Sequence, residues 1–210
     1  MSTSGRDLGM SVHGELTSVW ERDDCSLLRE MLKIYPRKPP QIIVDVTWGK
    51  GTMHRHADIT PYGFDLNPER AKDCVADFYH MPLKDASVDL LIFDPPHLYQ
   101  TGSPGVIKGL YNEYQKEDDP LLPFFTEARR VLVPEGVVFC KVCDFVTSAR
   151  YRWRVVDTVL AIRRAGLCPC DLIIKSRKAG VIKHPNWTCQ RHARKRHSYW
   201  LVARNSNKCS

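Results

Sequence analysis

The segment with the most specific chemistry is Asp94-Pro95-Pro96-His97, which follows an apolar run. Two consecutive prolines remove two backbone N–H donors and hold the chain in an extended form. The carbonyl groups of Asp94 and Pro95, together with the Asp94 carboxylate, then form a site that only accepts hydrogen bonds. An exocyclic amino group carries two protons and needs two acceptors, so this site suits the amino group of a base, with the His97 ring stacked on the base. A plain Pro-Pro stop after a buried strand is the alternative interpretation.

Acidic residues also stand at the ends of three other apolar runs. In an open α/β sheet such positions meet at the edge where ligands bind. Asp45 ends the first run, and the two glycines of Gly49-Lys50-Gly51 then permit a tight turn with close approach of the backbone to a ligand. Asp45 itself either binds a cationic group or orders this loop.

The second and third runs end in Asp65 and in Asp77-Phe78. A carboxylate at the first position can accept both ribose hydroxyls of a nucleoside cofactor. A carboxylate beside an aromatic ring can hold an adenine amino group and cover the adenine. Each acid alone is consistent with a helix cap or a solvated charge, but three at successive strand ends predict a nucleoside cofactor. The candidate cofactor-binding residues are Asp45, Thr47, Gly49, Gly51, Asp65, Asp77 and Phe78.

The elements that must position these residues predict an α/β fold. Continuous Val/Ile/Leu runs are typical of strands buried on both faces of a parallel sheet. We expect strands over 42–48, 62–65, 73–77, 88–94, 137–143, 171–174 and 198–203. Helices are expected just after Asp23-Asp24 and over 68–73, 120–132 and 153–165. The prediction is a doubly wound, mostly parallel, seven-stranded Rossmann-like sheet with an antiparallel C-terminal strand.

A chain of 210 residues favours one domain, which we expect over 19–210 after a flexible tail at 1–18. Mobile loops that face the substrate are expected at 99–119 and 175–197. The net charge of +7 favours an anionic partner, most commonly nucleic acid. The second loop is basic, and a solvated basic loop is the alternative to a binding surface. The candidate nucleic-acid-binding residues are Lys175, Arg177, Lys178, Lys183, Trp187, Arg191, Arg194, Lys195 and Arg196.

Several classes of protein are disfavoured by what the sequence lacks. No apolar run reaches the roughly 18 residues that a bilayer requires, and the first residues have no apolar signal core, so we expect a cytoplasmic protein without a membrane partner.

In a cytoplasmic protein we expect free thiols at the eight cysteines. Cys140 and Cys143 lie on an expected strand and point to opposite faces, so we expect no metal site. The oligomeric state stays open between monomer and homodimer.

Taken together, these motifs resemble those of class I S-adenosylmethionine-dependent methyltransferases, specifically the amino-methyltransferases of DNA and RNA bases. The resemblance covers about 42–204. Asp94–His97 matches the D/N/S-P-P-aromatic motif of the family, except that histidine stands where Tyr, Phe or Trp is usual. The other similar segments are the glycine-rich motif 45–52, the ribose acid Asp65, the adenine segment 77–94, the strand start 132–138 and the closing strand 196–202.

The resemblance implies S-adenosyl-L-methionine as cofactor and direct methyl transfer to an exocyclic amino group of a flipped-out or unpaired base. An acid at the first motif position is commoner in adenine enzymes, so adenine N6 in DNA is the leading expectation. An RNA base methyltransferase acting on adenine N6 or guanine N2 is the alternative. His97 also keeps open a catalytically silent module that binds nucleic acid. A nicotinamide-dependent oxidoreductase is disfavoured, because His54 stands where the dinucleotide turn has its third glycine.

Overall fold

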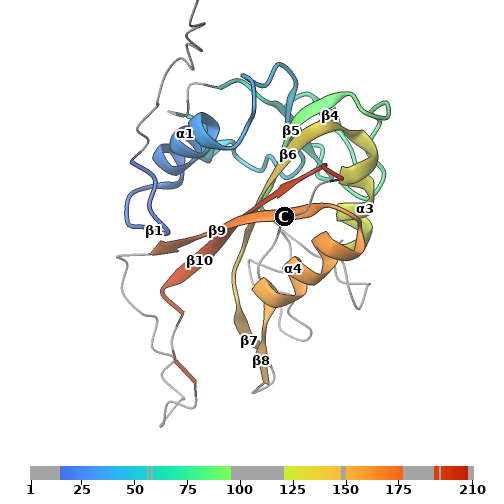
Figure 1. Ribbon diagram of the computed structural model, residues 1–210. Helices are drawn as coiled ribbons and strands as arrows, with labels where there is room; N and C mark the ends of the chain where they lie inside the picture. The colour runs from blue at the N-terminus through green and yellow to red at the C-terminus, as the bar shows by residue number, and fades with distance from the viewer. Residues whose placement is uncertain are drawn as a thin grey trace, which may run out of the picture.

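The computed structural model describes residues 15–55, 57, 59–95, 121–147, 150–176, 192–193 and 195–207. Residues 1–14 of the expected tail at 1–18, the whole expected loop at 99–119 and most of the basic loop at 175–197 lie outside these ranges. The elements, in chain order (Figure 1), are β1 (Val19–Trp20), α1 (Asp24–Ile34), β2 (Ile43–Asp45), the 3₁₀ helix η1 (Thr52–His54), β3 (Tyr62–Asp65), β4 (Cys74–Val75), β5 (Val88–Phe93), α3 (Leu121–Val131), β6 (Leu132–Val142), β7 (Phe145–Thr147), β8 (Arg150–Arg152), α4 (Arg154–Arg164), β9 (Cys168–Ser176) and β10 (His197–Arg204).

The main sheet has the strand order β1-β9-β10-β6-β5-β2-β3-β4. Strands β2 to β6 pair in parallel, whereas β10 runs antiparallel to both β6 and β9. The order runs outward from β2 in two directions, which places the topological switch point between β2 and β5. The expected doubly wound, mostly parallel sheet with an antiparallel C-terminal strand is confirmed.

The expected strand count of seven is wrong, because the described residues already form eight strands of the sheet. The additional strand is β1, which pairs in parallel with β9 through Val19 and Ile174. The backbone N–H of Ile174 also donates to the Ser18 carbonyl at 2.8 Å. Two residues of strand carry no detectable periodicity, so the sequence held no signal for this pairing.

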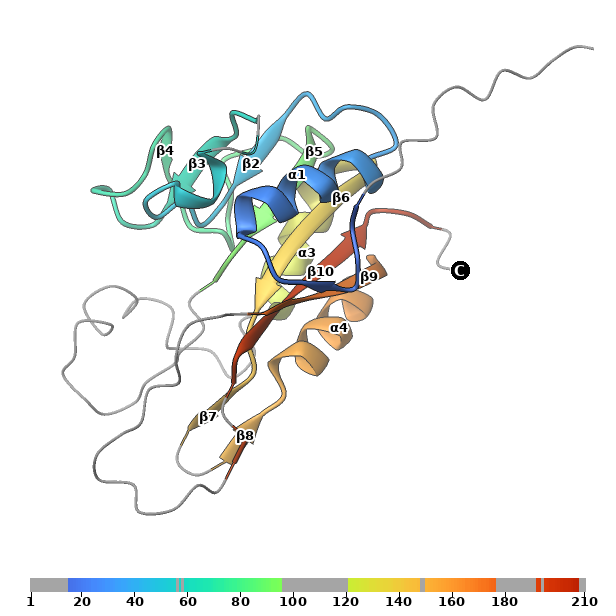
Figure 2. The ribbon, with the colours of Figure 1, turned by 90° about the vertical axis from the view of Figure 1, so that its left-hand side faces the viewer.

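Helices cover both faces of the sheet, with α1 on one face and α3 and α4 on the other (Figures 1 and 2). Strand β5 shows how the two layers form, because its successive side chains point to opposite faces. Leu91 and Phe93 pack in the core cluster that contains α3 and α4. Leu90 and Ile92 pack in the cluster that contains α1. The continuous apolar run of β5 therefore reflects burial on both faces.

The start of α1 is set by a local cap. The Asp23 carboxylate accepts a hydrogen bond from the Ser26 backbone N–H at 2.8 Å, which satisfies one of the free donors of the first turn. Leu27, Leu28 and Met31 then lie fully buried against the sheet. The helix expected after Asp23-Asp24 is confirmed, and its cap places Asp24 in the first turn, beside the carboxyl ends of β5 and β6.

The helix expected over 68–73 is wrong. This stretch forms turns, in which the backbone N–H groups of Arg70 and Ala71 both donate to the Asn67 carbonyl. The N–H groups of Lys72 and Asp73 donate to the Gly63 carbonyl instead of continuing a helix. A short segment gains little from helix nucleation, and these bonds to β3 compete with it.

Two further expectations about local structure differ from the observed chain. The antiparallel pair β7–β8 has no counterpart among the expected strands. Cys168, at the start of β9, is disulfide-bonded, so the expectation of free thiols is wrong at this position. Within the described ranges, every helix is too short or too polar to cross a bilayer.

Candidate active site

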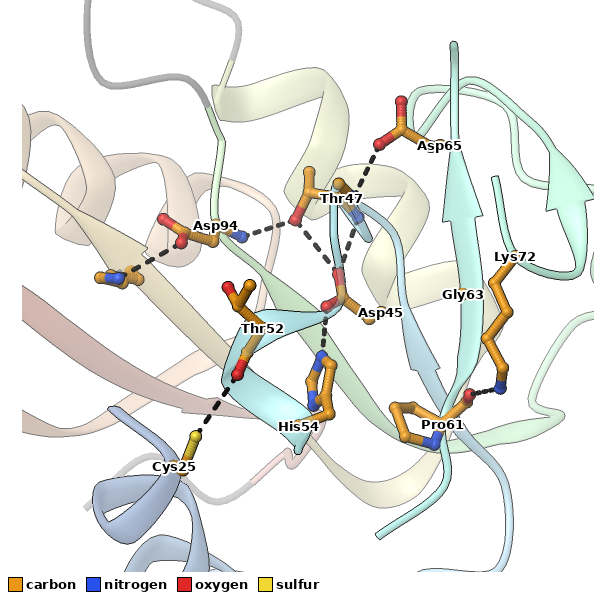
Figure 3. A network of polar contacts seen from close by, with 12 residues as sticks. Cys25, Asp45, Thr47, Thr52, His54, Pro61, Gly63, Asp65, Lys72 and Asp94 are labelled. Atoms are coloured by element: carbon orange, nitrogen blue, oxygen red, sulfur yellow. Dashed lines mark hydrogen bonds and ion pairs between the residues drawn. The ribbon is translucent and has the colours of Figure 1, made fainter. Parts of the chain in front are cut away.

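Asp94 follows the last residue of β5, at the edge of the sheet where β2 also ends. Its backbone N–H donates to the Thr47 hydroxyl at 2.8 Å, so the loop after β2 holds the main chain of Asp94 (Figure 3). Pro95 is buried behind it. Pro96 and His97, the other two expected catalytic residues, lie outside the described residues.

A buried lysine from the neighbouring strand contacts the Asp94 carboxylate. Lys141 Nζ lies 3.3 Å from Asp94 Oδ2 and 3.0 Å from Asp24 Oδ2. The other oxygen of Asp24 accepts a hydrogen bond from the indole N–H of Trp200 at 3.0 Å. A helix start and the ends of two parallel strands therefore meet in one charged cluster beside Asp94.

The Lys141–Asp24 pair was missed by sequence reasoning. Lys141 interrupts the apolar run of β6, and a lysine in a strand buried on both faces requires a charged partner. The need of Lys141 for a charged partner was the signal in the sequence that could have indicated this pair. The identity of the partner was not predictable, because Asp24 and Asp94 are each far from Lys141 along the chain.

The protonation state of Asp94 depends on a balance between burial and charge. Burial raises the pKa of the Asp94 carboxyl to about 6, against the opposing attraction of Lys141, and the nearby carboxylate of Asp24 adds to the increase. For Lys141, burial alone lowers the pKa, but the carboxylates of Asp94 and Asp24 outweigh it and hold the pKa above its usual value. Asp94 is therefore an ionised acceptor at neutral pH and loses its charge in mildly acidic solution.

Asp45 lies at the end of β2 and is almost entirely buried, with 1% of its surface exposed. One carboxylate oxygen accepts from the backbone N–H and the hydroxyl of Thr47, at 2.8 and 3.2 Å. The other lies 2.6 Å from Nε2 of His54 on η1. Of the two roles left open for Asp45, the geometry favours ordering of the loop. Thr47 in turn connects Asp45 to the main chain of Asp94 (Figure 3).

The two glycines of the turn have different surroundings. Both have positive φ angles, 57° at Gly49 and 60° at Gly51. A Cβ at Gly49 would make only an ordinary contact, 3.8 Å from the Thr47 carbonyl oxygen, whereas one at Gly51 would collide with the indole of Trp48. Trp48 is sandwiched in place, since its ring also lies over Gly63 of β3 and stacks on His54 with a centroid distance of 5.1 Å. The turn is thus open for a ligand at Gly49 and filled by Trp48 at Gly51.

The two acids expected to hold a nucleoside are partly exposed at the ends of β3 and β4. The Asp65 oxygens accept from the backbone N–H groups of Gly49 and Asn67, both at 2.9 Å. Asp77 accepts from the Tyr79 backbone N–H at 2.9 Å. A carboxylate has about four acceptor positions, so both acids keep capacity for hydroxyl or amino donors.

Phe78, the expected cover for an adenine ring, lies in the core. Its ring packs edge-to-face on Phe93 and Phe124, with centroid distances of 5.0 and 5.9 Å, and only 2% of its surface is exposed. Phe78 therefore packs in the core in this structure. Its chain neighbours Asp77 and Tyr79 are both half-buried.

Three of the nine expected nucleic-acid-binding residues are described. Lys175 is the next-to-last residue of β9 and donates to the Ser176 carbonyl at 2.7 Å. Lys195 places its ammonium group 4.0 Å from the ring centroid of Tyr151, and Arg196 is exposed just before β10. Residues outside the described ranges are Arg177, Lys178, Lys183, Trp187, Arg191 and Arg194.

The described residues include no cluster of three or more His, Cys, Asp or Glu side chains that could hold a metal ion. Cys140 is buried within β6, and the Cys143 thiol donates to the carbonyls of Asp144 and His197. Both cysteines are therefore accounted for by packing and hydrogen bonding.

No family model matches the sequence, and the search of curated proteins found no relative. Solved structures do match. A proposed methyltransferase in complex with the Trm112 methyltransferase activator of Haloferax volcanii has a TM-score of 0.58 at 18% identity, over 87% of this chain and 89% of that one. A proposed methyltransferase of Bacillus halodurans gives 0.56 at 12% identity, over 86% and 99%. An S-adenosylmethionine-dependent methyltransferase of Methanosarcina mazei gives 0.53 at 10%, over 83% and 96%. The chain therefore has the Rossmann-like fold of these methyltransferases.

Proposed function

We propose that the protein transfers a methyl group from S-adenosyl-L-methionine to an exocyclic amino group of a nucleic-acid base, namely adenine N6 in DNA. The observation that carries the proposal is the position of Asp94. It stands at the carboxyl end of β5, beside the switch point, where the Thr47 hydroxyl holds its main chain and Lys141 holds its carboxylate. The fold shared with methyltransferases agrees with this assignment.

The residues around the switch point fit a nucleoside cofactor. The open side of Gly49 admits close approach to the backbone, and Asp65 and Asp77 retain free acceptor capacity. We assign Asp65 to the ribose hydroxyls and Asp77 to the adenine amino group. Thr47, Gly51 and Asp45 shape the turn between them. When bound, S-adenosyl-L-methionine supplies an electrophilic methyl group on a sulfonium centre.

Asp94 and Pro95 bind the amino group of the base. The Asp94 carboxylate accepts one N–H, and the carbonyl oxygens of Asp94 and Pro95 are available for the other, because the following prolines offer no competing donor. These bonds orient the nitrogen lone pair toward the methyl group, and such positioning supplies much of the rate of a direct transfer. The amino nitrogen would form its bond to the methyl carbon as the sulfonium–methyl bond breaks, S-adenosylhomocysteine would leave as the neutral thioether, and the cationic nitrogen would then release a proton to solvent.

The proposal is tested by incubating the protein with tritiated S-adenosyl-L-methionine and DNA or RNA of the same sequence, followed by digestion to nucleosides. We expect the label in N6-methyl-2′-deoxyadenosine. Label in an RNA nucleoside alone would overturn the choice of DNA, and label in N4-methylcytosine would overturn the choice of base. Absence of label from every nucleoside, with the cofactor bound, would favour the silent binding module.

A further inference from the structure

The antiparallel pair β7–β8 forms a hairpin outside the main sheet, with Phe145 opposite Arg152 and Val146 opposite Tyr151. It extends beyond the sheet at the lower end of both views (Figures 1 and 2). The hairpin follows β6 directly, and β6 is parallel to β5. It therefore leaves the sheet from the same edge at which Asp94 lies.

A buried carboxylate fixes the hairpin to this edge. Asp144, which is 2% exposed, stands between β6 and β7. One of its oxygens accepts from the Tyr151 hydroxyl at 2.8 Å and the other from the Val155 backbone N–H of α4 at 2.9 Å. These bonds tie β8 and the first turn of α4 to the end of β6, so the hairpin holds a defined position relative to the active site.

The outer side chains of the hairpin are cationic and aromatic. Arg150, Arg152 and Trp153 are exposed, and Trp153 exposes 60% of its surface. Neither Arg150 nor Arg152 forms an ion pair with a carboxylate in the described part of the chain. Tyr151 and Trp153 lie on the other side of the strand from these arginines, with ring centroids 4.5 Å apart.

A second segment contributes charge to the side of the hairpin that carries Tyr151 and Trp153. Lys195, which precedes β10, places its ammonium group 4.0 Å from the Tyr151 ring centroid, and the His192 ring lies 6.4 Å from Tyr151. Two distant parts of the chain thus meet around one aromatic ring. The acidic group at the base of the hairpin, Asp144, is buried, so it is not itself part of this exposed surface.

We propose that this hairpin binds the DNA strand that carries the target base, a proposal that rests on the proposed function. Arginine pairs well with phosphate oxygens, and its planar group forms two parallel bonds. An exposed aromatic ring provides a stacking platform for a base that is unpaired. Arg150 and Arg152 contact successive phosphates, and Trp153 stacks on a base next to the flipped target. The packing of the core does not account for Trp153, because most of its surface faces solvent.

The test measures binding of a fluorescently labelled single-stranded DNA by anisotropy over a range of salt concentrations. The variant Arg150→Ala/Arg152→Ala is compared with the control Arg163→Ala/Arg164→Ala. The control removes two exposed arginines from the last turn of α4, the helix that follows the hairpin. We expect the hairpin variant to bind at least tenfold more weakly. Loss of two phosphate contacts should also lower the salt slope by about 1.4. The control pair should bind like the wild type.

Trp153→Ala separates stacking from charge. We expect affinity to fall by about five- to hundredfold while the salt slope stays constant, and Trp153→Phe to recover most of the loss. Circular dichroism and cofactor binding check that each variant is folded. If the hairpin variants bind and methylate DNA like the wild type, the hairpin proposal is overturned while the proposed function stands. If hairpin-dependent DNA binding occurs without methyl transfer, the hairpin proposal stands while the proposed function fails. Dependence on the hairpin for RNA alone would overturn the assignment to DNA.

Discussion

At the scale of single residues, the chemistry of the site depends on Asp94 and on the side chains that surround it. The sequence predicted Asp94 as an acceptor, because the two prolines that follow it have no backbone N–H and the segment therefore offers only acceptors. The lysine that contacts its carboxylate and the hydroxyl that holds its main chain were not predicted. Both contacts join residues 47 positions apart in the chain, and such pairings exist only once the strands are in register.

The pH dependence of the reaction should follow the ionisation of Asp94. The pKa of Asp94 is raised to about 6, so its acceptor form dominates above that pH and is lost as the pH falls through it. Lys141→Met removes the cation that opposes the increase, and the acidic limb of the rate profile should move to higher pH. The rate near pH 7 should fall severalfold while the rate near pH 9 changes little. Lys38→Met, at an exposed lysine, is the matched control. An unchanged acidic limb in Lys141→Met would show that Lys141 does not influence Asp94.

The Thr47 hydroxyl should matter for positioning. Thr47→Val removes the acceptor for the Asp94 backbone N–H and the donor to Asp45. An unpaired buried N–H costs about 1–3 kcal/mol, and we expect a drop in kcat of about tenfold or more together with a lower Tm. Thr47→Ser keeps the hydroxyl and should restore kcat. Steady-state kinetics of both variants measure this, and equal kcat values for valine and serine would contradict the positioning role.

At the scale of elements, the turn after β2 combines a predicted feature with an unpredicted one. The spacing of Gly49 and Gly51 predicted a tight turn, and both residues have the positive φ angles that favour glycine. The sequence did not predict that Trp48 would fill the space above Gly51 and Gly63. That space forms only when β3 pairs beside β2, so it cannot be predicted from a local sequence pattern.

The two glycines provide a matched pair of substitutions. Gly49→Ala and Gly51→Ala both place a side chain at positive φ, which costs about 1–2 kcal/mol. Only Gly51→Ala also collides with the Trp48 indole. We therefore expect it to lower the free energy of unfolding by about 1–3 kcal/mol more than Gly49→Ala, as measured by urea denaturation. Adding Trp48→Ala to each variant should remove most of this difference, and equal effects of the two single variants would place the Trp48 ring elsewhere.

At the scale of the whole molecule, long apolar runs made the fold predictable. Strands β2, β3, β5, β6, β9 and β10 and helices α1, α3 and α4 all overlap expected elements. The errors fall on short segments, namely β1, the β7–β8 hairpin and the turn over 68–73. The strands β1, β7 and β8 have two or three residues each and lie outside the long apolar runs, so they show no period, and their existence depends on a partner supplied by the rest of the chain. The hairpin that we propose to bind DNA belongs to this unpredicted class, because the Asp144 contacts that fix it are tertiary.

The central claim is that Asp94 accepts a hydrogen bond from the amino group that receives the methyl. It is tested most directly by measuring the rate of methyl transfer to DNA by Asp94→Ala at saturating S-adenosyl-L-methionine, with cofactor affinity determined calorimetrically on the same preparation. We predict a loss of transfer of at least about a hundredfold, with the dissociation constant of the cofactor within tenfold of the wild type. Transfer at the wild-type rate by Asp94→Ala would contradict the claim.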